Sequence, residues 1–201
     1  VSRAEITARV TAPGPFNLLF VGNLIPRKGL HTLLAALASL PRDDWRLTVA
    51  GSLTMDAAYV DAIRGQIKDA GLAPRVALLG ALSARELAAR CAASHLLAVP
   101  SSYEGFGIIY LEAMQFGLPA IAGTAGAAKE LITHGQNGFL VPPGNPEVLA
   151  YHLSLLIRDR DLLLKMSLAA HDRAAAHPTW NDSAARVRGF LQSFINLRPT
   201  H

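Results

Sequence analysis

The stretch NLLFVGNLIPRKGLHTLLAALASL, residues 17–40, decides the fold. Its first part, Asn17–Val21, is a short apolar run that ends at Gly22, which is typical of a strand buried on both faces. After a turn at Pro26, residues 29–40 repeat apolar side chains at helical spacing. A strand followed by a turn and a helix predicts the first βα unit of a parallel sheet.

Short apolar runs and amphipathic stretches continue to alternate along the chain. Further strands are predicted at residues 45–50, 75–79, 95–99, 119–122 and 139–141, and further helices at 56–70, 83–93, 107–116, 146–157, 161–176 and 179–197. Strands that alternate with helices of this length need right-handed crossovers, which cover a parallel sheet on both faces. We therefore predict an α/β fold, a single Rossmann-like doubly wound parallel sheet with helices on both faces and a C-terminal helical tail. Residues 1–15 are assigned to an N-terminal lead, 16–178 to the domain and 179–201 to the last helix.

The composition indicates a compact globular protein and restricts its partners. Hydrophobic residues make up 51% of the 201 positions and charged residues 17%, which excludes a disordered chain. The single cysteine, Cys91, excludes an internal disulfide and a thiolate metal cage, and it favours the reducing cytoplasm. The net charge of +4 comes from scattered basic residues without interleaved aromatics, so we expect no nucleic-acid partner. A mild basic excess suits a phosphate-bearing small molecule instead.

The turn after the first strand is a candidate phosphate site. Residues 22–29, GNLIPRKG, place Arg27 and Lys28 immediately before a predicted helix. Free backbone N–H groups and the positive end of the helix dipole would add to the two cations. On this stretch alone, a solvated basic turn remains the alternative. The spacing matches neither a Walker A loop nor a dinucleotide-binding GxGxxG motif.

The turn after the fourth strand carries a second candidate site, in residues 100–113, PSSYEGFGIIYLEA. Gly105 and Gly107 allow close approach of a ligand to the backbone. At the start of the helix the unpaired amides suit an anion; they belong to Phe106, Gly107 and Ile108.

Two carboxylates flank this helix start. Glu104 precedes the helix and Glu112 lies inside it, about 7 to 8 Å along the axis from Gly107. An elongated ligand with an anionic middle, such as a nucleoside diphosphate sugar, would fit between them, with Glu112 at the ribose and Glu104 at the sugar. The alternative is that Glu104 only favours the helix dipole and that Glu112 is an ordinary surface residue.

These motifs resemble those of the family-4, or group 1, retaining glycosyltransferases. The resemblance rests on Glu104 and Glu112 with seven residues between them, LEAM at 111–114, GLP at 117–119 and NGFLVPPGN at 137–145, and it extends over about residues 16–195. It implies a GT-B architecture of two facing Rossmann-like domains. This chain would be the C-terminal, donor-binding half, and an N-terminal acceptor-binding half would be missing.

The resemblance also implies an activity. The enzyme would transfer a hexose from a UDP-, GDP- or ADP-linked sugar to an unknown acceptor with retention, without a metal or cofactor. The isolated chain would be inactive, and membrane association is expected only through the missing half. Glu104 would contact the transferred sugar, Lys28 the diphosphate and Glu112 the ribose, with Glu104 and Lys28 as the candidate catalytic residues. The other expected donor contacts are Gly22, Asn23, Arg27, Ser52, Val76, Leu82, Gly105, Phe106, Gly107 and Ile108.

One residue departs from the family pattern. Asn23 stands where the family often has an arginine that binds the diphosphate, and Arg27 is the candidate substitute. A domain that binds nucleotide without turnover therefore stays open as the alternative function. A phosphorylase or an epimerase is a third reading, although no candidate general base is prominent at a strand end.

No metal site is expected from the remaining polar residues. The acidic pair in Asp159-Arg160-Asp161 joins two predicted helices, so we interpret it as a helix cap. The seven histidines have no ligand spacing, and only His134 lies in a loop that could border the cleft. A plain turn is the favoured interpretation of that loop as well.

Overall fold

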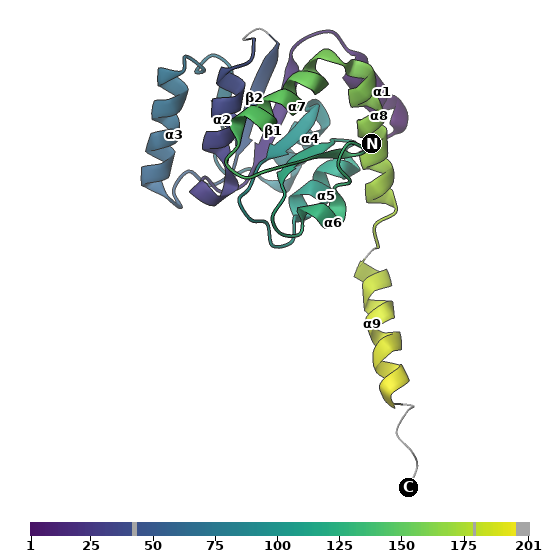
Figure 1. Ribbon diagram of the computed structural model, residues 1–201. Helices are drawn as coiled ribbons and strands as arrows, with labels where there is room; N and C mark the ends of the chain where they lie inside the picture. The colour runs from purple at the N-terminus through teal and green to yellow at the C-terminus, as the bar shows by residue number, and fades with distance from the viewer. Residues whose placement is uncertain (42–43, 179, 196–201) are drawn as a thin grey trace.

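A six-stranded sheet forms the centre of the molecule in the computed structural model, which describes residues 1–41, 44–178 and 180–195 (Figure 1). The strands are β1 (Phe16–Val21), β2 (Trp45–Ala50), β3 (Val76–Leu78), β4 (Leu96–Val99), β5 (Ala120–Gly123) and β6 (Gly138–Val141). They are ordered β3-β2-β1-β4-β5-β6, and every adjacent pair is parallel. The predicted fold class is confirmed.

The direction of the chain across the sheet reverses between β1 and β4. β1 pairs with β2 along its whole length, and its residues Leu18 and Leu19 pair with β4 on the other side. In parallel sheets, such a reversal opens a crevice outside the carboxyl ends of the two strands, and ligands bind there. The turns that follow Val21 and Val99 meet at this crevice.

Helices cover both faces of the sheet. Their bounds are α1 (Arg3–Thr11), α2 (Leu30–Ala38), α3 (Ala57–Asp69), α4 (Ala84–Ala93), α5 (Ile108–Gln115), α6 (Ala128–Leu131), α7 (Pro146–Arg158), α8 (Arg160–Ala175) and α9 (Trp180–Ile195), with a 3-10 turn, η1, at Pro26–Lys28. α2 packs against α3 and α7, whereas α8 packs against α1 and α5 (Figure 1). Right-handed crossovers on the two sides of the reversal place these two groups on opposite faces.

The core lies between the sheet and these two helical layers. In β1, Leu18, Leu19 and Phe20 are at most 1% exposed, so consecutive side chains are buried on opposite faces. Cys91 is also buried, and burial raises the pKa of its thiol to about 11. This confirms its interpretation as a small core residue.

The sequence pattern does not predict α1 or α6. α1 begins with a capping box between Ser2 and Glu5 and buries only Ile6 and Val10 of its nine residues. Its packing is nevertheless tight, since a Cβ added at Gly117 would lie 2.5 Å from Ile6 Cδ1. Residues 3–11 are therefore part of the packed body, whereas α6 is a four-residue helix in the turn after β5.

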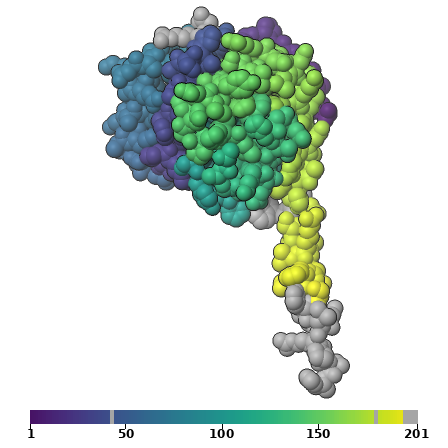
Figure 2. Space-filling model, in the orientation of Figure 1, coloured from purple at the N-terminus to yellow at the C-terminus, as the bar shows by residue number. Residues whose placement is uncertain are grey.

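The last helix extends away from the body. Figure 2 shows α9, in yellow, projecting below the packed helices and sheet. Its Val187, Phe190 and Leu191 are between 56% and 63% exposed. Residue 179 and residues 196–201 of the predicted tail lie outside the described residues. None of the described helices is long and apolar enough to cross a membrane.

Candidate functional site

The structure brings Lys28 and Glu104 into direct contact at the β1/β4 crevice. Lys28 Nζ donates a hydrogen bond to Glu104 Oε2 at 2.6 Å, across 76 residues of sequence. Each side chain is 14% exposed, so the pair is largely shielded from water but reachable from the crevice. A cation and a carboxylate thus lie side by side at the edge of the sheet where a ligand is expected.

Two glycines place Lys28. Gly29 has a φ of 74°, and a Cβ added there would lie 2.4 Å from the carbonyl oxygen of Pro100. Only glycine therefore allows the turn after β1 to pass so close to the end of β4. At Gly22, an added Cβ would lie 3.3 Å from Lys28 Cδ and Cε, which shows that the aliphatic part of the lysine covers the Gly22 backbone.

The turn after β5 fixes the backbone of Glu104. Its carbonyl accepts from the N–H of Ala127 at 2.8 Å, and its own N–H donates to the carbonyl of Ala125 at 3.3 Å. Gly126 lies between them with a φ of 89°, and a Cβ there would be 2.1 Å from the Glu104 carbonyl oxygen. The carboxylate is held separately, because Ser101 Oγ donates to Glu104 Oε2 at 3.3 Å.

Asn23 and Arg27 tie neighbouring turns together. A guanidinium nitrogen of Arg27 donates to the Tyr103 carbonyl at 2.5 Å, which links the turns after β1 and β4. Asn23 Oδ1 accepts from the N–H of Ser52 at 3.4 Å, which links the turns after β1 and β2. Both side chains are exposed, and their expected contacts with a diphosphate stay predictions.

The start of α5 offers free backbone donors. Gly107 caps the helix with a φ of 68° and without a side-chain hydrogen bond to the first turn. Within the described residues, the amides of Phe106, Gly107 and Ile108 donate to no protein acceptor. Phe106 is 81% exposed and Ile108 57% exposed, so this end of the helix faces solvent. Such a helix start can bind an anion.

The other residues that the sequence predicts as donor contacts lie in several different elements. Glu112 is exposed on α5. Burial of Cys91 is the main cause that raises the pKa of its thiol, and the charge of Glu112 raises this pKa further. Leu82 is half-buried in the turn after β3. Val76 is the first residue of β3 and pairs with Leu47, so it does not lie at the carboxyl edge with Lys28. Gly105 is exposed beside Phe106.

Local contacts describe two further residues that the sequence analysis interpreted, Asp159 and His134. Asp159 accepts from the N–H of Leu162 at 2.8 Å and caps α8, as predicted. His134 Nδ1 accepts from the N–H of Leu140 at 3.1 Å, which ties its turn to the following strand, β6. Among the residues that the structure describes, no group of three His, Cys, Asp or Glu side chains is arranged to hold a metal ion.

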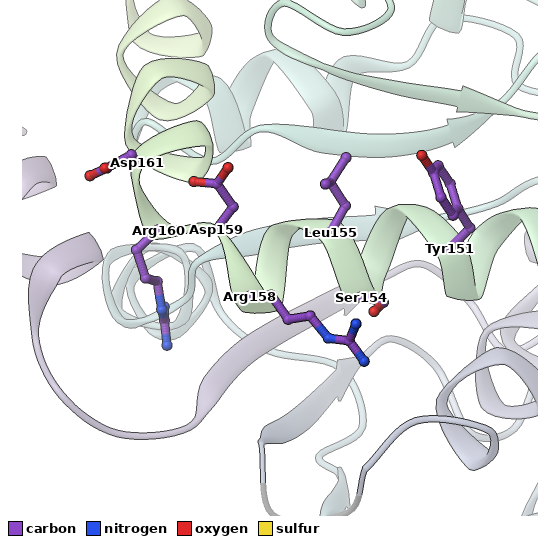
Figure 3. A pocket seen from close by; sticks show the side chains of 7 residues that line it. All are labelled: Tyr151, Ser154, Leu155, Arg158, Asp159, Arg160 and Asp161. Atoms are coloured by element: carbon purple, nitrogen blue, oxygen red, sulfur yellow. The ribbon is translucent and has the colours of Figure 1, made fainter.

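A hollow at the opposite end of the sheet is separate from this site. Figure 3 shows its lining at the junction of α7 and α8, including Tyr151, Arg158 and Arg160. Arg160 donates to the carbonyl of Gly14 at 3.2 Å and lies 5.4 Å above the ring of Phe16, at the amino end of β1. The hollow therefore borders neither Lys28 nor Glu104.

Several residues that support the Lys28–Glu104 pair are not among those predicted from the sequence. Ser101 and Tyr110 are buried next to Glu104, and Gly126 is contributed by a different turn. Ser101 lies three residues before Glu104, so its polarity at the end of a buried strand was a usable signal. Gly126 carries no such signal, because its partner Glu104 is distant in sequence.

The family model of the glycosyl transferases group 1 matches residues 2–173. The chain belongs to this family. Among curated relatives of this glycosyltransferase domain, a GDP-mannose-dependent alpha-(1-6)-phosphatidylinositol monomannoside mannosyltransferase of Mycobacterium tuberculosis is 31% identical over 200 residues, which are 95% of this chain and 51% of the relative. A D-inositol 3-phosphate glycosyltransferase of Pseudarthrobacter chlorophenolicus is 34% identical over 86% of the chain and 41% of its own length. The chain thus spans about half the length of these relatives or less.

Solved structures of glycosyltransferases have the same fold. HepE of Anabaena, in complex with UDP and glucose, is 30% identical with a TM-score of 0.82, over 96% of this chain and 53% of that one. The C-terminal domain of the group 1 glycosyl transferase LpcC of Francisella tularensis is 27% identical with a TM-score of 0.75, over 87% of this chain and 91% of that one. The LpcC structure is that of a C-terminal domain alone, and the match covers nearly all of it.

Proposed function

We propose that this domain binds a nucleoside diphosphate sugar and contributes Lys28 and Glu104 to the transfer of a hexose with retention of configuration. The observation that carries the proposal is the contact between these two side chains, 2.6 Å apart in the β1/β4 crevice. The uncapped start of α5 adds backbone donors to the turn that holds Glu104. A cation, an anion-binding helix start and a carboxylate are the three groups that such a donor requires.

Lys28, Glu104 and Glu112 would have separate roles in the transfer. During the reaction, the bond from the sugar carbon to the diphosphate oxygen breaks, a bond to the acceptor hydroxyl oxygen forms, and the acceptor proton is released. The departing nucleoside diphosphate gains negative charge. Lys28 and the α5 amides would neutralise that charge, while Glu104 would accept hydrogen bonds from the sugar hydroxyls and orient the reacting carbon. Glu112 would hold the ribose.

The acceptor would bind to a second domain that lies outside this chain. Support comes from the length of the relatives, since the chain corresponds to 51% of the mycobacterial mannosyltransferase. Names of relatives specify GDP-mannose, and the Anabaena structures contain UDP or UDP-glucose, so a UDP- or GDP-linked hexose is the favoured donor. Because these relatives are transferases, turnover by the whole protein is favoured over a domain that only binds nucleotide.

Calorimetric titration tests the proposal. The chain is titrated with UDP, GDP, ADP, UDP-glucose and GDP-mannose, and the tightest ligand is repeated with Lys28→Ala and Glu112→Ala. We expect saturable binding that both substitutions weaken at least about fivefold. Lys68→Ala is the matched control, because Lys68 is an exposed lysine in the last turn of α3. Absence of binding to every ligand would contradict the proposal, and efficient transfer by this chain alone would contradict the missing acceptor domain.

A further inference from the structure

One hydroxyl group is almost completely buried beside the Lys28–Glu104 pair. Ser101 is 1% exposed and lies two residues after Val99, the last residue of β4, and its Oγ lies 3.3 Å from Glu104 Oε2. The same carboxylate oxygen accepts from Lys28 Nζ at 2.6 Å. Within the described residues, Glu104 Oε1 makes no hydrogen bond. One oxygen of the carboxylate is therefore held by the protein and the other is available to a ligand.

A neighbouring phenol is the competing acceptor for the proton of Ser101. Tyr110 is fully buried, and its hydroxyl donates to the Val99 carbonyl at 3.0 Å. The side chain of Ser101 lowers the pKa of Tyr110 as a hydrogen-bond donor, so the two hydroxyl groups are within reach of each other. Because the single phenol proton is given to Val99, Tyr110 can only accept from Ser101. Burial raises the pKa of Tyr110, and the charge of Glu104 raises it further, so the phenol stays neutral. Of its two acceptors, Ser101 favours the charged one, Glu104.

The position of Ser101 is itself fixed. Its N–H donates to the Val99 carbonyl at 2.8 Å. A Cβ added at Gly123 would lie 1.9 Å from the Ser101 carbonyl oxygen, so the ends of β4 and β5 are in close contact at this residue. The hydroxyl is thus carried by a closely packed backbone on a short side chain, whereas the other partner of Glu104 is the end of a long lysine side chain.

We infer that Ser101 is a positioning residue, whose buried hydroxyl keeps the Glu104 carboxylate aligned with the transferred sugar after a bound diphosphate has drawn Lys28 away. The inference rests on the proposed function, because it concerns the same carboxylate. A diphosphate competes with Glu104 for Lys28, and the remaining bond from Ser101 then determines the direction of Oε1. Ser101 should therefore affect the affinity for the sugar part of the donor and not the affinity for the nucleotide part.

The test compares nucleotides with and without a sugar. Calorimetry gives the ratio of the dissociation constants of UDP and UDP-glucose, and of GDP and GDP-mannose, for the wild-type chain and for Ser101→Ala, Glu104→Ala and the double variant. Ser102→Ala is the matched control, because Ser102 is an exposed serine on the same turn whose hydroxyl lies 3.4 Å from the Arg27 carbonyl oxygen. Ser101→Cys keeps most of the side-chain volume with a weaker donor, and it replaces Ser101→Ala where that variant does not fold.

We expect Ser101→Ala to lower the sugar-dependent ratio about five- to tenfold, as for the loss of one side-chain hydrogen bond of ordinary strength, while the affinity for the nucleotide alone changes less than about twofold. In the Glu104→Ala background, which has no acceptor for the Ser101 hydroxyl, Ser101→Ala should have no further effect on the ratio. Ser102→Ala should match the wild type.

An unchanged ratio in Ser101→Ala, or an equal loss with and without Glu104, would overturn the inference. A wild-type chain that binds nucleotide but gains nothing from the sugar would overturn it as well, while donor-nucleotide binding stands. A wild-type chain that binds none of the four ligands would reject the proposed function itself, and the inference with it.

Discussion

The ammonium group of Lys28 and the carboxylate of Glu104 lie 2.6 Å apart and are both 14% exposed. Neither group has much water around it, so each depends on the other for compensation of its charge. A ligand that binds Lys28 therefore competes with Glu104 for the same ammonium group. In this structure the two charged groups of the candidate site are therefore paired with each other.

This competition predicts that a change in Glu104 strengthens nucleotide binding. Glu104→Gln leaves Lys28 without its carboxylate partner, so the affinity for a nucleoside diphosphate should rise about three- to tenfold, the range of a partly shielded ion pair. Calorimetry with UDP and GDP measures the change. In the whole protein, the same variant should lose sugar transfer, because the carboxylate would no longer orient the sugar.

A double-mutant cycle separates this competition from simple repulsion between Glu104 and the phosphates. In Lys28→Met, the substitution Glu104→Gln should no longer improve affinity, because there is no cation left to release. If the gain in affinity were the same with and without Lys28, the pair would not control the site.

The glycine that places Lys28 should not tolerate a side chain. Gly29→Ala puts a Cβ at a φ of 74° and 2.4 Å from the Pro100 carbonyl oxygen, so we expect the free energy of unfolding to fall by about 2–4 kcal/mol. Gly65→Ala is the control, since Gly65 lies inside α3 with no atom within 4 Å of an added Cβ. That variant should be more stable by about 0.5–1 kcal/mol, because alanine favours a helix. Urea denaturation of both variants measures the two changes in the free energy of unfolding, which should have opposite signs.

Burial of His95 should make stability depend on pH. The side chain accepts from the N–H of Asn17 through Nδ1 at 2.8 Å, and its Nε2 lies 3.2 Å from the Arg9 carbonyl oxygen, so Nε2 carries the proton. Burial lowers the pKa of His95 from 6.5 to about 4. Between these values the unfolded chain binds more protons than the folded one, so acid favours unfolding. We expect His95 to account for a loss of about 3 kcal/mol between pH 7 and pH 4.

Denaturation of the wild type and of His95→Gln at several pH values measures this contribution. The glutamine variant should be less stable at pH 7, because its amide replaces the imidazole imperfectly. It should also lose less stability on acidification. Parallel pH profiles for the two proteins would show that His95 is not the group responsible.

Patterns of side chains along the chain were sufficient for most of the fold. The apolar run at residues 17–21 and the helical spacing after Gly29 correspond to β1 and α2. Short elements were not predictable in this way, because α1 buries only two residues and its stability depends on packing against a distant turn at Gly117.

The candidate site could be named from the sequence by residue type, but its internal contacts could not. Glycines, a lysine and a carboxylate after two strands indicated the crevice. The direction of each side chain depends on neighbours far away in sequence, as with Arg27, which donates to Tyr103 76 residues later. Periodicity carries no information about such contacts, so the hydrogen bonds of Asn23 and Ser101 emerged only from the folded structure.

Asn23 offers a last prediction, because it stands where an arginine is common in the family. Asn23 is exposed at the carboxyl end of β1, close in sequence to Lys28, so an arginine has room there. Asn23→Arg should bind UDP or GDP about three- to tenfold more tightly, since a guanidinium can pair with two phosphate oxygens. The gain should shrink at high salt. Asn23→Ala is the control, because it removes only the bond to the Ser52 N–H. If Asn23→Arg binds no more tightly than Asn23→Ala, the diphosphate does not reach this turn.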